Sequence, residues 1–130
     1  MTEKSPKQNI NWYPGHMFKA KKELIKQLKN VDIVLEMRDA RIPISSKNQD
    51  FEELLCQKKR ILLFNKTSLA DSKVTKKWSS IFKNSKTPFL FIDALRKVDL
   101  GKILPLAQVL MQQKRSTFIR RGITPPSLRL

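Results

Sequence analysis

The sequence has one cysteine, three glycines and no hydrophobic run as long as a membrane-spanning helix. A lone thiol forms no internal disulfide and is too little for a structural zinc site, so we expect Cys56 to pack on an apolar helix face. A spanning helix takes about 18 apolar residues, and residues 1–11 are polar and contain no secretory signal. We therefore expect no membrane partner, no disulfide-linked partner, no metal ligands and a cytoplasmic location.

Acidic residues are also scarce. The sequence has 11 Asp and Glu but 27 Lys and Arg, and its formal net charge is +16. This charge predicts a polyanionic partner, and nucleic acid fits better than an anionic membrane surface. Hydrophobic residues make up 40% of the 130 residues, which excludes disorder throughout and allows a real core. The length predicts one domain.

Three apolar runs have the pattern of buried parallel strands, and they cover residues 31–38, 60–64 and 87–92. Amphipathic segments between and around them predict helices that begin near Met17, Phe51, Asp71 and Asp99. This order predicts an α/β fold of three layers, in which a short parallel sheet has helices on both faces. We expect a disordered lead-in at residues 1–10, the folded unit at residues 11–113 and a basic linker or tail at residues 114–130.

The carboxyl ends of the predicted strands carry the polar residues with the most chemistry. In open α/β sheets, ligands bind beyond those ends. Asp39 and Arg41 follow the first strand, Asn65-Lys66-Thr67-Ser68 the second and Asp93-Ala94 the third. Asp39 and Arg41 fit either a salt-bridged loop or a functional loop, and we favour the latter because they lie at the ligand edge.

An Asn-Lys pair at this place begins the Asn-Lys-x-Asp element by which GTPases read guanine. In this chain Ser68 stands where that Asp would be, and its hydroxyl has no full negative charge to pair with two ring donors. Guanine selectivity is therefore in question. The substitution Ser68→Asp is expected to restore the base-reading carboxylate.

Basic residues gather on helix faces and near the end of the chain. Such faces are either solvated or in contact with phosphates, and both interpretations stay open. The candidates for RNA or ribosome contact are Lys19, Lys22, Lys26, Arg41, Lys73, Lys76, Lys77, Arg120 and Arg121. His16 follows a Pro-Gly turn at the start of a helix, where a capping role and a functional role are both open.

Three motifs at matching spacing resemble the amino-terminal part of the ribosome biogenesis GTPase A family, also called RbgA or YlqF, which are circularly permuted GTPases. They are Trp12-Tyr13-Pro14-Gly15-His16-Met17 with Lys19-Ala20, then the stretch from Asp39 to Asn48, then Asn65-Lys66. The resemblance covers roughly residues 10–130. It implies the guanine-side half of a permuted P-loop GTPase domain.

The resemblance also implies roles. It assigns nucleotide binding to Asn65, Lys66, Thr67 and Ser68 and, through a second base-contacting loop, to Asp93 and Ala94. It assigns His16 a part in GTP hydrolysis, with GTP and Mg²⁺ as cofactors. It implies rRNA and the large ribosomal subunit as partners.

No G-x-x-x-x-G-K-[ST] occurs in the 130 residues, so this chain has no phosphate or Mg²⁺ ligands of that kind. We expect a chain truncated before the phosphate loop that does not hydrolyse GTP alone. We also expect a free side on the 31–38 strand, where the phosphate-loop strand would pair, and hence a marginal or self-associating protein. The alternatives are a short natural protein that acts as a non-catalytic RNA- or ribosome-binding module, and an unrelated basic nucleic-acid-binding domain.

Overall fold

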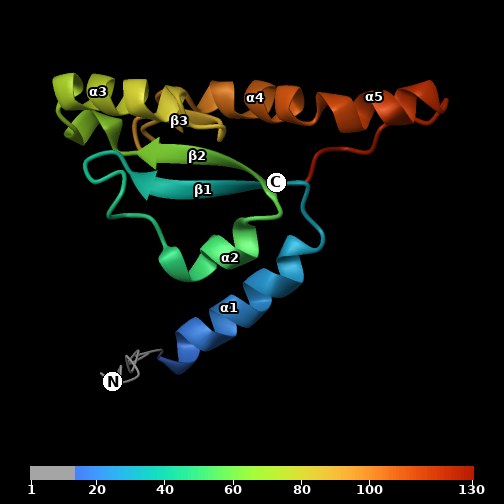
Figure 1. The fold of residues 1–130 in the computed structure, drawn as a ribbon, viewed down its shortest axis with the longest axis horizontal. Helices are drawn as coiled ribbons and strands as arrows, with labels where there is room; N and C mark the ends of the chain where they lie inside the picture. Colours follow the sequence, from blue (N-terminus) through green and yellow to red (C-terminus); the bar gives the residue numbers. More distant parts are fainter. Residues whose placement is uncertain (1–13) are drawn as a thin grey trace, which may run out of the picture.

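The computed structural model describes residues 14–130, so the predicted lead-in at residues 1–10 and the aromatic pair before Pro14 lie outside it. Its core is a parallel sheet of three strands in the order β1 (Ile33–Asp39), β2 (Lys59–Asn65) and β3 (Phe89–Phe91). The register places Leu35 beside Ile61 and Leu63 beside Leu90. The predicted α/β fold with a short parallel sheet is therefore confirmed (Figure 1).

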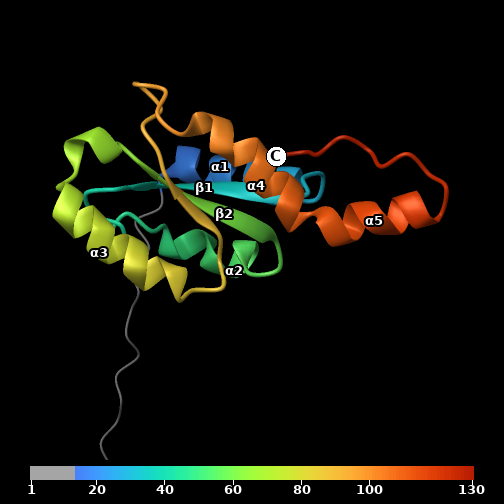
Figure 2. The same cartoon turned by 90° about the horizontal axis from the view of Figure 1, so that it is seen from above.

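Helices and short turns connect and cover the strands. The α-helices are α1 (Gly15–Leu28), α2 (Glu52–Leu55), α3 (Ser72–Lys83), α4 (Ile103–Leu110) and α5 (Gln112–Arg120). Short 3-10 turns cover Gln49–Phe51, Thr67–Leu69 and Leu100–Lys102. Figure 2 shows α3 and α4 on opposite sides of the strands, so the sheet is the middle of three layers.

The side chains of β2 alternate between two hydrophobic clusters. Ile61 and Leu63 join the cluster that includes Ala107 and Met111, on the α4 side. Leu62 and Phe64 point to the opposite face and join Phe82 of α3. All four strand residues from 61 to 64 are buried, as expected for a strand covered on both faces.

Local capping is as predicted at one helix and differs at another. The Asp71 carboxylate accepts a hydrogen bond of 2.9 Å from the Val74 N–H and so caps α3. Asp99, predicted to cap the last helix, makes no capping bond; it has a left-handed φ of 59° and pairs with Lys102 at 2.8 Å. The prediction of a buried Cys56 is also wrong, because α2 ends just before it and leaves the thiol exposed.

Helix α1 has its predicted apolar stripe, but little of the protein covers it. Figure 1 shows α1 running away from the sheet beyond β1. Within α1 only Leu28 is buried, while Met17, Phe18 and Ile25 remain exposed. Strand β1 lies at an edge of the sheet and pairs with no strand other than β2 among the described residues, although the Arg129 carbonyl accepts a hydrogen bond from the Ile33 N–H at its start. Self-association through these surfaces stays a prediction.

Residues 114–130, predicted as a linker or tail, contain most of α5 and a segment that returns to the sheet. Gly122, with a φ of 70°, follows the end of the helix. The returning chain packs Leu128 against the α4-side cluster, and the Arg129 carbonyl accepts a hydrogen bond of 2.8 Å from the Asp32 N–H. The prediction of an unpacked tail is therefore wrong. The division of the chain into domains stays a prediction.

Asp32 holds this returning segment in place, and its titration should be visible in stability. Its carboxylate accepts hydrogen bonds from Lys114 at 2.7 Å and from Arg129 at 3.4 Å. Lys114 foremost, then Arg129, lowers the pKa of Asp32 from 3.8 to about 2. Because the folded pKa lies below the unfolded one, the stabilisation is complete above about pH 4 and is lost as the pH falls toward 2.

The variant Asp32→Asn is thus expected to lower the melting temperature at pH 7 by several degrees, corresponding to about 1 kcal/mol for such partly exposed partners. Thermal unfolding followed by circular dichroism between pH 7 and pH 2 would show it, with Glu53→Gln as an exposed-carboxylate control. Equal melting temperatures for wild type and Asp32→Asn at pH 7 would contradict the role of Asp32.

Candidate functional site

The three strands end together, and hydrogen bonds between their last residues join them into one edge. The Asn65 carbonyl at the end of β2 accepts from the Ala40 N–H at 2.8 Å, just beyond β1. On the other side, the Thr67 N–H donates to the Ile92 carbonyl at 3.1 Å, just beyond β3. Side chains that follow any of the three strands therefore lie on a common carboxyl edge.

Asn65 connects two of the predicted nucleotide-binding segments. Its side-chain Oδ1 accepts a hydrogen bond of 2.9 Å from the backbone N–H of Ala94. The adjoining Thr67 hydroxyl donates to the Ile92 carbonyl at 2.6 Å, so that hydroxyl is already engaged inside the fold. The structure thus brings Asn65, Thr67 and Ala94 together as the strand order predicts.

Lys66 turns toward the first strand instead. Its backbone is left-handed, with a φ of 65°, which begins the sharp turn after β2. Its Nζ lies 3.3 Å from Oδ2 of Asp39, and Arg41 binds the same carboxylate at 2.9 and 2.7 Å. These bonds, led by that of Arg41, hold the pKa of Asp39 well below its usual range. The loop after β1 is therefore salt-bridged, and any RNA contact by Arg41 has to use the part of its side chain that remains exposed.

Ser68 and Asp93 were both predicted at the edge, but sequence reasoning missed that they interact with each other. The Arg96 N–H donates to the Asp93 carboxylate at 2.9 Å. The hydroxyl of Ser68, foremost, lowers the pKa of Asp93. Asp93 is only 5% exposed, whereas Ser68 is exposed.

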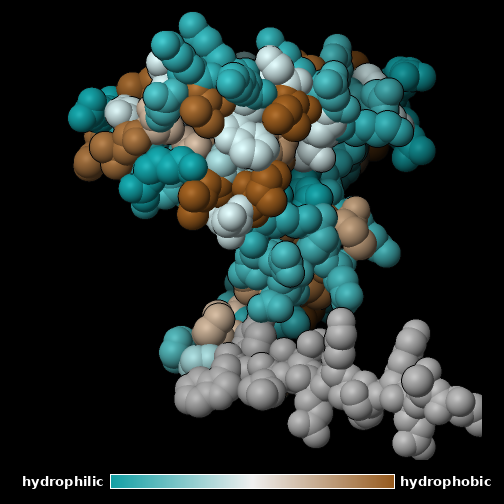
Figure 3. Space-filling model, turned by 60° about the vertical axis from the view of Figure 1, so that its left-hand side comes forward, coloured by the Kyte–Doolittle hydropathy of each residue, from teal (hydrophilic) through white to brown (hydrophobic). Residues whose placement is uncertain are grey.

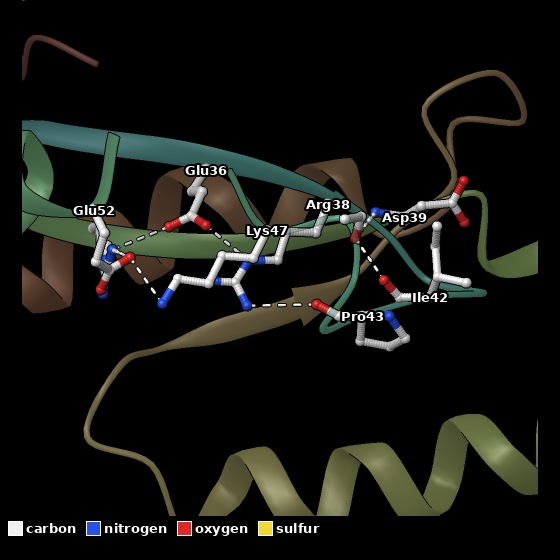
Figure 4. A network of polar contacts seen from close by, with 9 residues as sticks. Glu36, Arg38, Asp39, Ile42, Pro43, Lys47 and Glu52 are labelled. Carbon is white, nitrogen blue, oxygen red and sulfur yellow. Dashed lines mark hydrogen bonds and ion pairs between the residues drawn. The ribbon is translucent and has the colours of Figure 1, made fainter. Parts of the chain in front are cut away.

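A network of charged side chains connects the loop after β1 to neighbouring parts of the fold (Figure 4). The Arg60 guanidinium bridges Glu52 at 2.8 Å and Glu36 at 3.3 Å, and Arg38 donates to Glu36 at 2.7 Å. Arg60 foremost, then Lys47, lowers the pKa of Glu52 to about 2. This network joins α2 and the loop to the sheet, and it therefore holds the loop in position at the carboxyl edge.

The carboxyl edge has shallow hollows rather than a deep cleft. One hollow of about 210 Å³ is lined by Met37, Arg38, Asp39, Ser46, Asn65 and Lys66. Its neighbour of about 310 Å³ lies between Arg41 and the start of α3. Figure 3 shows hydrophobic residues among hydrophilic ones on the side of the protein where the strands end. Exposed apolar side chains of the edge include Met37, Ile42, Ile44, Leu69 and Val74, and Leu95 and Val98 beyond β3.

The chemical groups of residues 14–130 limit what the edge can bind. This part of the chain holds no group of three or more His, Cys, Asp or Glu side chains placed to bind a metal ion. None of its helices is long and apolar enough to cross a membrane. The described residues thus supply the edge with amide, hydroxyl, amine and carboxylate groups.

Comparison with known proteins identifies the sequence class. No protein-family model matches the chain. It is 42% identical to ribosome biogenesis GTPase A of Bacillus licheniformis over 120 residues, which are 92% of this chain and 42% of that protein. It is 38% identical to the protein of that name from Priestia megaterium, covering 90% of this chain and 41% of the relative. It is 36% identical to mitochondrial ribosome-associated GTPase 1 of Mus musculus, over 78% of this chain and 31% of that relative.

Over 90–92% of its length, the chain is 35–42% identical to proteins named ribosome biogenesis GTPase A. This confirms the resemblance predicted from the three motifs. The chain spans about two fifths of the length of the ribosome biogenesis GTPase A proteins it matches, with values from 40% to 43%. Residues 14–130 therefore show the geometry of only part of such a protein.

The remaining residues named by the family resemblance do not all reach the carboxyl edge. His16 is exposed in the first turn of α1, which Figure 1 shows standing away from the ends of the strands. Within the described residues the structure does not bring His16 to Asn65. The lysines named on α1 and α3 and the arginines that end α5 are all exposed. Their roles stay predictions.

Asn65 offers a direct test of how the edge is held together. Replacing it with alanine removes the acceptor for the Ala94 N–H, so that amide should lose its protection against hydrogen exchange. The global stability should fall by only about 1 kcal/mol, because one partly exposed hydrogen bond is removed. Exchange measured by NMR would show this, and Asn65→Asp, which keeps an oxygen acceptor, should retain the protection. Unchanged exchange at Ala94 in Asn65→Ala would contradict the hydrogen bond.

Proposed function

We propose that this chain forms the guanine-reading part of a circularly permuted GTP-binding protein of the ribosome biogenesis GTPase A type. The carrying observation is that hydrogen bonds join the loop after β2 to the loop after β3, from Ala94 to Asn65 and from Thr67 to Ile92, in a chain similar to that family. Asn65 and Ala94 come from the two loops that such a site needs, and the hydrogen bond between them pre-arranges the edge. A pre-formed polar edge lowers the cost of ordering a ligand.

The residues present fit the base of GTP better than its phosphates. The edge offers an amide, a hydroxyl and a carboxylate, which are groups that hydrogen-bond a nucleobase. Phosphate sites of this fold use glycine-rich backbone N–H groups and a lysine, and Mg²⁺ prefers oxygen ligands from Ser, Thr or Asp beside those phosphates. The 130 residues contain no such loop. When bound, GTP would supply the phosphoryl group, and Mg²⁺ would neutralise the charge of the phosphates. This chain would hold the base. By itself, the chain is not expected to hydrolyse GTP.

The proposed partner is rRNA of the large ribosomal subunit. The relatives carry names that refer to ribosome biogenesis and to association with the mitochondrial ribosome. In support, α3 exposes Lys73, Lys76, Lys77 and Lys83, and among the described residues none of these four forms an ion pair with an acid. A face of unpaired lysines suits the phosphate backbone.

Sedimentation with separated ribosomal subunits tests this partner. The 130-residue chain should pellet with large subunits at about 100 mM salt and much less with small subunits, because both carry phosphates and only the large one is the proposed target. Poly(U) competitor controls for charge alone. Equal recovery with both subunits at every salt concentration would refute the specific partner.

A second candidate is a non-catalytic basic RNA- or ribosome-binding module that uses no nucleotide. The observation that favours it is Ser68 at the position of the guanine-reading Asp. The two candidates differ at the carboxyl edge. The module would bind large subunits without any response of Asn65 or Ala94 to guanine nucleotides.

A further inference from the structure

The chain after β3 forms a closed turn, and Figure 2 shows the segment between β3 and α4 projecting from the body of the protein. The 93–98 turn begins at Asp93 and ends at Val98, and these two residues form an antiparallel bridge. The Val98 N–H donates to the Asp93 carbonyl at 2.9 Å, and the Asp93 N–H donates to the Val98 carbonyl at 3.2 Å. Within the turn, the Arg96 N–H donates to the Asp93 carboxylate at 2.9 Å. Hydrogen bonds therefore fix both the ends and the middle of the turn.

The backbone of this segment adopts a conformation that side chains other than glycine rarely take. Lys97 has a left-handed φ of 57°, and Asp99, just after the turn, has a φ of 59°. Such a conformation costs free energy and persists only where neighbouring contacts enforce it, and it is frequent at functional sites. The 93–98 turn is thus held in one shape, at a cost that its own folding does not require.

The side chain at the tip of the turn is Leu95, which is 93% exposed. No other large hydrophobic residue in the described part of the chain is as exposed. Arg96 and Lys97 follow it and are also exposed, and among residues 14–130 neither forms a salt bridge with an acid. A single exposed leucine is common on protein surfaces. This one is held outward by a fixed turn beside two cations, so a partner could bind it without ordering the loop first.

We propose that the 93–98 turn is a docking element for another protein. Leu95 inserts into an apolar pocket of the partner, and Arg96 and Lys97 contact carboxylates at the rim of that pocket. This inference goes beyond the reading of a base. It rests on the proposed function in one respect, because it places the partner among the proteins of the large ribosomal subunit.

The chemistry of the tip favours a protein over RNA as the direct partner of Leu95. A leucine side chain has no aromatic face on which a base can stack and no group that hydrogen-bonds a base edge. Its burial is favourable only where apolar atoms surround it. The two cations beside it then favour a partner with carboxylates. A second copy of this chain does not fit, because its formal net charge is also +16.

Sedimentation of the 130-residue chain with large ribosomal subunits tests the contribution of the leucine. Leu95→Ala should weaken binding by about tenfold, because the buried apolar contact is lost. The slope of log affinity against log salt should not change, since no charge is removed. Leu104→Ala removes an exposed leucine from α4 and is the matched control, which should bind as the wild type does. Circular dichroism would show that both variants are folded.

Photochemical crosslinking identifies what lies against the tip. Leu95→Cys in a Cys56→Ser background gives one thiol for labelling with benzophenone maleimide, because Cys56 is the only cysteine of the chain. Leu104→Cys in the same background is the control. After irradiation on large subunits and digestion with ribonuclease, the label at position 95 should be joined to a ribosomal protein. The label at position 104 should give little of that product.

The outcomes separate this inference from the proposed function. If the wild type binds large subunits and Leu95→Ala binds equally well, the docking element is overturned while the proposed partner stands. A label at position 95 that crosslinks to rRNA alone also overturns the inference, because RNA would then face the tip. If the wild type does not sediment with large subunits, both the proposed partner and this inference fail.

Discussion

Replacing Phe64 with alanine is expected to cost about 3–5 kcal/mol of folding free energy. Phe64 is fully buried at the centre of the aromatic cluster on the α3 side, with its ring 4.6 Å from that of Phe82 and 4.9 Å from that of Phe91. Removing the ring would leave a cavity between the sheet and α3 that the surrounding strands cannot close. Small domains have only about 5–15 kcal/mol of stability, so this loss would be a large fraction of the total.

Urea unfolding followed by tryptophan fluorescence would measure this change in stability, since Trp78 lies on the α3 side of the same cluster. Val74→Ala on α3 is a suitable control, because that side chain is largely exposed and should cost little. A destabilisation below about 1 kcal/mol for Phe64→Ala would show that the aromatic cluster does not hold α3 to the sheet.

Reversing the charge of three lysines on α3 should weaken binding to large-subunit rRNA by about 100-fold or more, at about 1 kcal/mol for each phosphate that is no longer bound. The changes are Lys73→Glu, Lys76→Glu and Lys77→Glu, all at exposed positions. The slope of log affinity against log salt should become shallower by about 0.7–0.9 for each of these phosphates. The helix should persist, because glutamates in its first turns favour the dipole.

Filter binding or fluorescence anisotropy over a range of salt concentrations would show both effects. The charge-preserving variant with arginine at the same three positions is the matched control and should keep the wild-type slope. An unchanged slope in the glutamate variant would place the RNA interface elsewhere, with α1 and the end of α5 as the remaining predicted surfaces.

The structural features that the sequence could predict are those set by local pattern. The apolar run at 61–64 predicts a strand covered on both faces, and Leu62 and Phe64 do alternate with Ile61 and Leu63 between two clusters. Parallel strand order then brings Asn65 to the same edge as the loop after β3 without further information. The Asp71 cap is equally local, because the bond spans three residues.

The features that could not be predicted depend on contacts between distant residues or on side-chain direction. Composition made residues 114–130 look like a tail, but Asp32 reaches Lys114 across 82 residues and fixes them to the start of β1. The exposure of Cys56 follows from where α2 ends, which periodicity over four residues cannot settle. The interaction with Ser68 that lowers the pKa of Asp93 joins two loops, so it depends on the tertiary structure.

The central claim is that the carboxyl edge of the sheet reads a guanine base, and chemical-shift mapping on the 130-residue chain tests it most directly. Titration with GMP should shift the amides of Asn65, Ser68 and Ala94 together, with one saturating affinity, while AMP at the same concentration leaves them nearly unchanged. Shifts confined to the lysines of α1 and α3, and equal for GMP and AMP, would mean that only the phosphate is bound. That result would contradict the claim.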